Sequence, residues 1–259
     1  VAMTEFVCPG PLARCVQDAR TFLEVIAEQS YARKTLGGGL KIGWCPAPEG
    51  RAVDPAVADS VYQAVLKLQD MGHEIIETDL PINNWKDIFG PLVLAVESRE
   101  RGHLLDEGAD LLTEYERATL EAALTLTHDA VERATRELEI FRQRMDGFFD
   151  GFDAVVTPAT ATTAFELGQR PTLVDGRPVS ELWGAFPFTS PFNVAGTPGA
   201  SIPCGLVEGM PVGIQVIAAQ GRDQFVLDLS QNLEESLAFD HSYLQRKWSA
   251  LEIQNKVSG

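Results

Sequence analysis

Three serines in an irregular part of the sequence, Ser180, Ser190 and Ser201, are the first candidates for a catalytic nucleophile. A serine needs a neighbouring base to lose its proton, and histidine is the usual one. No histidine lies between His128 and His241, and none of these serines sits in a Gly-x-Ser-x-Gly turn. We therefore expect no Ser-His-Asp triad built on these serines, although residues far apart in sequence can still meet in space.

The spacing of the cysteines and histidines gives little support for a catalytic thiol or a metal site. Cys204 follows Ile202-Pro203 at the end of an apparent strand, where a small buried apolar residue is expected rather than a nucleophile. No Cys-x-x-Cys pair and no two histidines within one helical turn occur among Cys8, Cys15, Cys45, Cys204, His73, His103, His128 and His241. We expect no metal site and no disulfide framework, which suits a reducing, cytoplasmic environment.

The amino-acid composition restricts the classes of molecule that this protein could bind. The 259 residues carry 21 Lys and Arg against 37 Asp and Glu, a net charge of −16, so most of the surface would repel a phosphate backbone. No stretch approaches 18 uninterrupted apolar residues, and no basic-then-apolar leader opens the sequence. We expect no nucleic-acid partner and no membrane partner.

Apolar spacing predicts the elements of the first half of the chain. Residues 12–26 repeat at three and four and form an amphipathic helix that starts at Pro9-Gly10-Pro11. A strand at 40–44, a helix from Asp54 to Gly72 and a strand at 74–78 then make a parallel crossover unit.

Two features of this half could be functional or ordinary. Gly37-Gly38-Gly39 could cradle a phosphate, but no Lys-Ser/Thr follows, so we expect a plain linker turn. His73 follows Gly72 between helix and strand, and we expect a surface or capping residue there rather than a catalyst.

A long helix is predicted in the middle of the chain, after a shorter one at 85–101. Thr113 and Glu116 form a capping box that would open it. A heptad row could form a coiled-coil or dimer seam, but its short length favours one long helix laid across a sheet; the row is Leu124, Val131, Leu138 and Met145.

The second half is richer in loops. A buried strand at 153–157 is followed by a segment from Pro158 to Pro211 in which prolines concentrate, with a tight turn at 174–177. Strands at 200–204 and 212–217 and a helix at 223–238 close the sequence. Irregular segments this long inside a folded domain are often functional.

Four blocks of residues, 10–19, 152–158, 192–205 and 210–216, together resemble successive blocks of the amidase signature family. The resemblance implies an α/β fold, with a mixed β-sheet flanked by helices, and equates residues 1–259 with the C-terminal portion of the amidase domain. Within it, residues 1–157 would hold helices and the strand-helix-strand unit. Residues 158–259 would hold a loop-rich, pocket-lining region, two strands and a closing helix.

The catalytic residues implied by the resemblance are missing from this sequence. The family uses a serine nucleophile, a second serine in a cis peptide and a lysine base, which precede the block at Gly10 and lie in a Gly/Ser-rich signature. No such signature occurs here, and the sequence opens at Val1 without an initiator methionine. We therefore expect a fragment with no catalytic residue of its own, inactive alone, and an intact enzyme that needs no metal and no organic cofactor.

The loop before the Asn-x-x-Gly block is the part expected to line the substrate pocket. The resemblance implies pocket positions for Phe186, Thr189 and Asn193, with Asn193 bracing the loop. Family members that deamidate glutamine usually carry an acidic residue where this chain has Phe186, so an apolar acyl or aryl amide fits better. Phe186 could equally be a core residue packed beneath the loop.

Three functions remain open at this point. The first is an amidase that hydrolyses a small carboxylic amide to an acid and ammonia or an amine. The second is the glutamine-hydrolysing subunit of a tRNA amidotransferase, and the third is a non-catalytic binding protein on an amidase-like scaffold. Apolar surface left open by a missing half would self-associate, so the expected partners are a small amide substrate and either further copies of the chain or its missing N-terminal portion.

Overall fold

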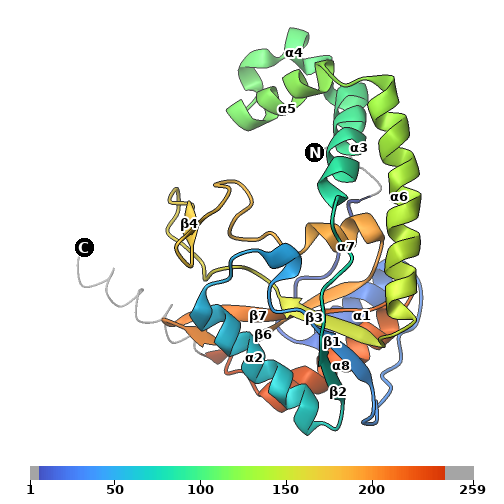
Figure 1. Cartoon of the computed structure of the whole chain (residues 1–259), viewed down its shortest axis with the longest axis vertical. Coiled ribbons are helices and arrows are strands. Elements are labelled where there is room, and N and C mark those ends of the chain that lie inside the picture. The colour runs from blue at the N-terminus through green and yellow to red at the C-terminus, as the bar shows by residue number, and fades with distance from the viewer. Residues whose placement is uncertain (1–5, 243–259) are drawn as a thin grey trace, which may run out of the picture.

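A five-stranded sheet lies at the centre of the computed structural model, which describes residues 6–242 (Figure 1). The strand order is β2-β1-β3-β7-β6. Strands β2, β1 and β3 are parallel, whereas β7 is antiparallel to β3 and β6 is antiparallel to β7. The predicted mixed sheet is therefore confirmed, with strands β1 (Lys41–Trp44), β2 (Glu74–Glu77), β3 (Ala154–Pro158), β6 (Gly199–Val207) and β7 (Met210–Ile217).

The predicted strand-helix-strand crossover is present as β1, α2 (Pro55–Asp70) and β2. The Asp54 carboxylate caps α2 by accepting hydrogen bonds from the backbone amides of Ala56 (2.8 Å) and Val57 (3.4 Å). Every apolar position of the predicted spacing is buried, namely Val57, Val61, Val65 and Leu68.

The glycine triplet is a linker, as expected. The amide of Gly39 donates to the carbonyl of Gly72 at 2.7 Å, so it is already used within the fold. A Cβ atom on Gly38 would lie 3.1 Å from the carbonyl oxygens of both Met71 and Gly72. The triplet therefore lets this segment run close against the end of α2.

Each face of the sheet has its own apolar core. On one face α2 packs with α1 (Val16–Ala27) and α8 (Asp223–Leu237), and on the other lie α3 (Trp85–Arg101), α6 (His128–Phe149) and α7 (Ser190–Ala195). Neighbouring residues of β3 alternate between the two cores, since Val156 belongs to the first and Val155 to the second. Both faces of the strand are thus buried.

The single long helix predicted from Thr113 is wrong, because the chain forms two helices there. The capping box of Thr113 and Glu116 is confirmed, but it opens α5 (Glu114–Leu124), and α6 starts separately at His128. Thr125 donates its hydroxyl to the carbonyl of Ala122 at 2.8 Å, and Thr127 caps α6. These local side-chain bonds compete with helix continuation and divide the element.

The α6 helix packs across the sheet. The four residues of the heptad row do not lie on one helix, so they form no continuous seam. Leu138 and Met145 are buried in the second core, whereas Leu124 lies on α5 and is 69% exposed. In Figure 1, α6 runs beside α3, and both continue into an arm that carries α4 (Leu104–Glu107), the short turn Ala109–Leu111 and α5. Arg101 ties the arm together through Glu97 (3.1 Å) and Glu116 (2.7 Å).

The first helix begins later than the spacing predicted. It starts at Val16, and Leu12 is fully exposed. The Glu234 carboxylate of α8 accepts the backbone amide of Val16 at 3.0 and 3.1 Å, so a tertiary contact sets where the helix starts.

A buried ion pair joins α1 to α8. Arg20 contacts Asp228 at 2.9 Å, and both side chains are only 2% exposed. Arg20 also donates to Gln231 (3.0 Å) and to the carbonyl of Tyr31 (2.8 Å), while Asp228 accepts the amide of Lys34 (3.1 Å). The pair thus connects two helices and the segment that follows α1.

The edge strand β6 is interrupted near its middle. Its pairing with β7 shifts register between Pro203 and Gly205, which leaves Cys204 as an extra residue. A Cβ atom on Gly205 would collide with the hydroxyl of Ser60 on α2. Glycine therefore allows α2 to lie close against this strand.

His73 is buried, which corrects the expectation of a surface or capping residue. Its side chain is 4% exposed, and neither ring nitrogen has a hydrogen-bond partner among residues 6–242. Burial lowers the pKa of His73 from its ordinary value near 6.5, with the Asp153 carboxylate opposing that effect. The glycine linker and the start of β2 enclose a residue that the sequence pattern placed in a turn.

Replacing Arg20 should destabilise the fold strongly. Arg20→Ala leaves the Asp228 carboxylate buried without its cation, which should lower the free energy of unfolding by about 3–5 kcal/mol. Urea denaturation measures the change. The matched control is Arg33→Ala, whose exposed pair with Glu235 should be worth about 0–1 kcal/mol. Equal losses for the two variants would contradict a special role for the buried pair.

Acid should destabilise the protein partly through His73. The unfolded chain takes up a proton on this histidine below about pH 6.5, while the folded chain resists it, so stability should fall as the pH drops from 8 towards 5. His73→Phe should flatten that slope in denaturation curves measured across the range. The control is His128→Gln, which removes a histidine whose side chain is 84% exposed. The slope should flatten more in His73→Phe than in this control. An unaltered slope in His73→Phe would refute the assignment.

Candidate functional site

The predicted pocket residues lie on α7 and on the segment that joins a small hairpin to it. The hairpin consists of β4 (Leu173–Val174) and β5 (Arg177–Pro178), with the predicted tight turn between them. Phe186 is half-buried, Thr189 is exposed just before α7, and Asn193 lies within that helix. No hydrogen bond or ring contact links any two of these three side chains within residues 6–242.

The backbone of this segment is fixed to the end of β3. The amide of Ala161, just beyond β3, donates to the carbonyl of Ala185 at 2.8 Å. Gln215 of β7 is buried, and its Nε2 donates to the hydroxyl of Thr157 (3.0 Å) and to the carbonyl of Phe188 (3.3 Å). The Phe188 ring is fully buried in a small cluster with Ala52, Ala161 and Val174. Residues 185–188 are therefore positioned by two strands.

Phe186 belongs to an aromatic ledge, which we define as Trp183, Phe186 and Arg170. The two rings meet edge to face with centroids 6.3 Å apart, and Trp183 is 49% exposed. The Arg170 guanidinium lies 5.8 Å from the Phe186 centroid and donates to the carbonyl of Leu182 at 3.0 Å. The ledge therefore combines two aromatic rings, one of them half-exposed, with a cation.

Asn193 braces the start of the described chain. Its Nδ2 donates to the carbonyl of Phe6 at 2.9 Å. On the same helix, the carbonyl of Val194 accepts a bond from Arg142 of α6 at 3.2 Å. These contacts hold α7 in place, and Thr189 stands exposed at its N-terminal end.

None of the candidate nucleophiles has the surroundings of a catalytic residue. Ser180, Ser190 and Ser201 make no hydrogen bond to a histidine in the part of the chain that the structure describes. Cys204 is partly buried, its thiol contacts the carbonyl of Val212 at 3.5 Å, and burial raises its pKa to about 12. A thiol with so high a pKa is protonated at neutral pH and unreactive.

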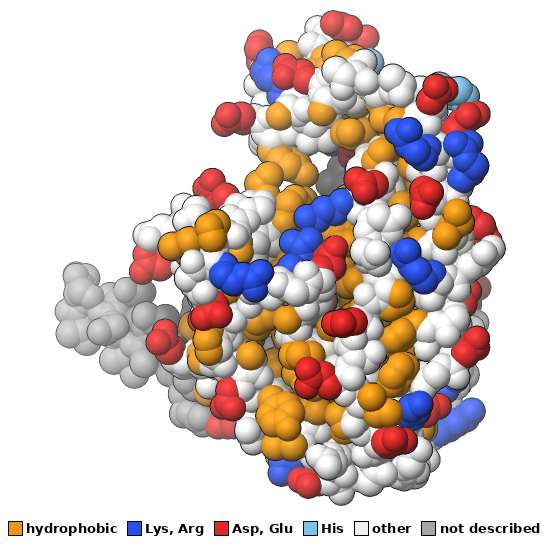
Figure 2. All heavy atoms as spheres, in the orientation of Figure 1, with side chains coloured by type: hydrophobic (Ala, Val, Ile, Leu, Met, Phe, Trp, Pro, Cys, Tyr) orange, Lys and Arg blue, Asp and Glu red, His pale blue; other side chains and the backbone are white. Residues whose placement is uncertain are grey.

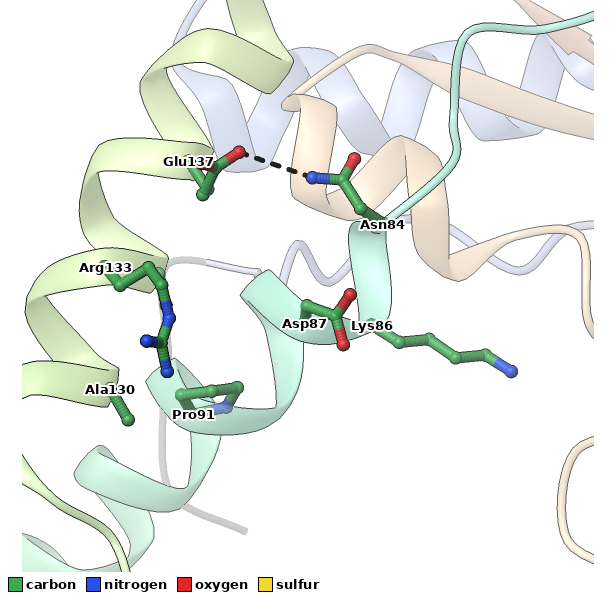
Figure 3. Close-up of a pocket in the computed structure, with 8 residues that line it drawn as sticks. Asn84, Lys86, Asp87, Pro91, Ala130, Arg133 and Glu137 are labelled. Atoms are coloured by element: carbon green, nitrogen blue, oxygen red, sulfur yellow. Dashed lines mark hydrogen bonds between the residues drawn. The ribbon is translucent and has the colours of Figure 1, made fainter.

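A cleft that the sequence did not indicate lies between α3 and α6 (Figure 3). It has a volume of about 500 Å³ and contains both acids and bases, being lined by Asn84, Lys86, Asp87, Pro91, Ala130, Arg133, Ala134 and Glu137. Asn84 donates to Glu137 across it at 3.4 Å. The cleft includes none of the three predicted pocket residues. Its shape depends on how α3 packs against α6, and the spacing of residues along the chain does not reveal that packing.

Two further properties concern residues 6–242. No group of three or more histidine, cysteine or acidic side chains is arranged there to hold a metal ion. None of the helices in that range is both long and apolar enough to cross a membrane.

Comparison with known proteins adds to this geometry. Residues 2–227 match the family model described as Amidase. An indoleacetamide hydrolase from Bradyrhizobium diazoefficiens is 29% identical over 87% of this chain and 45% of its own length. A glutamyl-tRNA(Gln) amidotransferase subunit from Clostridium botulinum is 26% identical over 89% of this chain and 55% of its own.

Solved structures agree on the fold. A crystal structure described as an amidase superposes with a TM-score of 0.80 at 29% identity, covering 87% of this chain and 52% of that one. A bacterial aryl acylamidase of the amidase signature family gives a TM-score of 0.76 at 22% identity, over 90% of this chain and 54% of that one. The chain thus spans about half the length of the relatives that it matches.

Proposed function

This chain belongs to the amidase signature family, and on that premise we propose that it supplies the C-terminal portion, with one wall of the substrate pocket, of an enzyme that hydrolyses a small carboxylic amide. The products would be the acid and ammonia or an amine. Residues 1–157 would contribute helices and the crossover unit, and residues 158–259 the pocket-lining loops.

The aromatic ledge is the observation that carries the choice of substrate. Phe186 stands where glutamine-deamidating members of the family usually carry an acid, and here it is partnered by Trp183 and Arg170. A ring held edge to face by another ring favours an apolar acyl or aryl group over a charged amino group. The name of the 29% identical relative, an indoleacetamide hydrolase, is consistent with an aromatic substrate.

The contribution of this chain to catalysis would be binding and orientation. Amide hydrolysis requires an activated oxygen nucleophile, a proton donor for the leaving amine and donors that stabilise the oxyanion. We propose that the serine pair and the lysine of the family lie outside these 259 residues. Bonds from Gln215 and Ala161 would then hold the loop of Phe186 and Thr189 so that substrate is placed against those groups.

A second candidate is the glutamine-hydrolysing subunit of a tRNA amidotransferase, which the 26% identical relative supports. Phe186 argues against it, because an aromatic ring does not pair with the ammonium group of glutamine as a carboxylate does. A comparison of glutamine with an aryl amide as substrate separates the two candidates.

The isolated 259-residue chain should not hydrolyse amides above background, since positioning without a nucleophile gives little acceleration. The test is an assay of the purified chain against aliphatic and aryl amides, together with labelling by a serine-directed fluorophosphonate. Turnover that disappears in Ser190→Ala or Ser201→Ala would contradict the proposal. Turnover by the intact enzyme would separate the amidase from a non-catalytic scaffold.

In the intact enzyme, Phe186→Ala should reduce kcat/KM for an aryl amide by about 10–200-fold, because a ring that contacts substrate contributes roughly 1–3 kcal/mol of transition-state binding. Propionamide, which is too small to reach the ring, should be affected much less. Phe186→Asp should shift preference towards glutamine, whose amino group could pair with the new carboxylate.

The matched control is Phe165→Ala, which removes an exposed phenylalanine from the same irregular segment. It should leave kcat/KM for all three substrates unchanged. Equal losses for all substrates in Phe186→Ala, accompanied by a lower Tm, would mean that Phe186 is a core residue.

A further inference from the structure

The three parallel strands end at one edge of the sheet, where ligands commonly bind in α/β folds. The chain leaves β1 into the turn Pro48–Gly50, leaves β2 towards α3, and leaves β3 towards the β4–β5 hairpin. Arg51 follows the turn after β1, Lys86 lies in the first turn of α3, and Arg177 lies on β5 of the hairpin. We call Arg51, Lys86 and Arg177 the basic cluster.

Specific contacts around Glu49 hold the basic cluster together. The Glu49 carboxylate accepts from Arg51 at 2.7 and 2.8 Å and from the indole nitrogen of Trp85 at 3.1 Å. The Lys86 ammonium lies 5.6 Å from the centroid of the Trp85 ring. Arg177 donates to the carbonyl of Gly50 at 2.9 Å. One acid thus sits among three bases.

The cluster keeps donors available for a ligand. Lys86 and Arg177 are exposed, and neither forms an ion pair within residues 6–242. Arg51 uses Nε and Nη2 on Glu49, which leaves Nη1 of its guanidinium for another acceptor. In Figure 3, Lys86 extends away from α6 and out of the cleft that contains Arg133 and Glu137.

The positive charge is unusual for this protein, whose net charge is −16. Figure 2 shows Lys and Arg side chains gathered between the base of the helical arm and the hairpin, beside a recess in the surface. Asp87 and Asp175 are neighbours of the cluster in sequence, but Glu49 is the carboxylate that bonds within it. An anion that approaches this recess would meet the cluster before the acidic remainder of the surface.

The turns that present the cluster are held in an uncommon conformation. Three of the six non-glycine residues with positive φ in the described range occur here: Glu49 (55°), Asn84 (64°) and Asp175 (48°). Such a backbone costs free energy and persists where the surrounding contacts enforce it. Trp85 directly follows Asn84, and Arg51 and Arg177 lie two residues after Glu49 and Asp175.

We propose that the basic cluster binds the carboxylate of a small organic acid. The planar fork of arginine matches a carboxylate, and lysine adds an adjacent point charge. This identification of the ligand rests on the proposed function, since the carboxylate would be the far end of an amide substrate. The substrate would then be an amide whose apolar acyl group carries a carboxylate at its far end.

Equilibrium binding to the chain itself tests the site without any need for catalysis. The probe is glutarate, titrated while tryptophan fluorescence is followed; the neutral diamide glutaramide and inorganic phosphate serve as comparison ligands. Trp85 lies beside Lys86, so the signal should be lost in Trp85→Phe. We expect glutarate to bind saturably and glutaramide not to bind.

Lys86→Gln and Arg177→Gln should each weaken glutarate binding at least about tenfold, the effect of losing one hydrogen bond to a charged group. Arg136→Gln, which removes an exposed cation of α6, should leave binding unchanged. Both cluster residues are exposed, and circular dichroism with thermal melting confirms that the variants fold.

Three results would overturn the proposal: no binding of glutarate, equal binding in the cluster variants, or phosphate binding as tight as glutarate, which would indicate unselective attraction of anions. If glutarate fails to bind while the intact enzyme hydrolyses aryl amides, the basic cluster is refuted and the proposed function stands. If glutarate binds and the intact enzyme hydrolyses no amide, the basic cluster stands as an anion site and the proposed function is refuted.

Discussion

The buried ion pair of Arg20 and Asp228 is the contact on which the rest of the architecture depends. It joins the first and last described helices, and through the carbonyl of Tyr31 and the amide of Lys34 it also holds the segment that leads into β1. Two charges withdrawn from water are tolerated because each finds further polar partners. With α1 and α8 held together, one face of the sheet is covered.

Much of this fold could be predicted from the sequence because the apolar spacing that marks each helix or strand is a local property. The spacing of Val57, Val61 and Leu68 is that of one buried helix face, and the structure buries all three. Two of the errors arose where distant residues decide. Glu234 sets the start of α1 from the other end of the chain, and the turn before His73 packs against a linker more than 30 residues away in sequence. The break at Thr125 needed no distant partner, but its threonines were not recognised as helix-ending side chains.

The site could be predicted only in part, and for a related reason. The resemblance to a family predicts that the loop around Phe186 lines the pocket, and this stays a prediction. It said nothing of Arg170, which lies over the ring from an irregular segment without periodicity. The basic cluster draws Arg51, Lys86 and Arg177 from three separate parts of the chain, each of which follows a parallel strand. Parallel strands bring such connections to one edge, so a functional surface can be built from residues that no motif unites. The topology of the sheet, more than spacing along the sequence, brings the residues of such a surface together.

The interruption of β6 bears on how this molecule avoids unwanted polymerisation. An open strand edge invites the backbone of another molecule to extend the sheet, which is the first step towards fibrils. Pro203 has no amide proton to donate to an incoming strand. The extra residue Cys204 also shifts the spacing of the remaining backbone amide donors of β6. The protein can therefore present this edge at high concentration with less risk of stacking into aggregates.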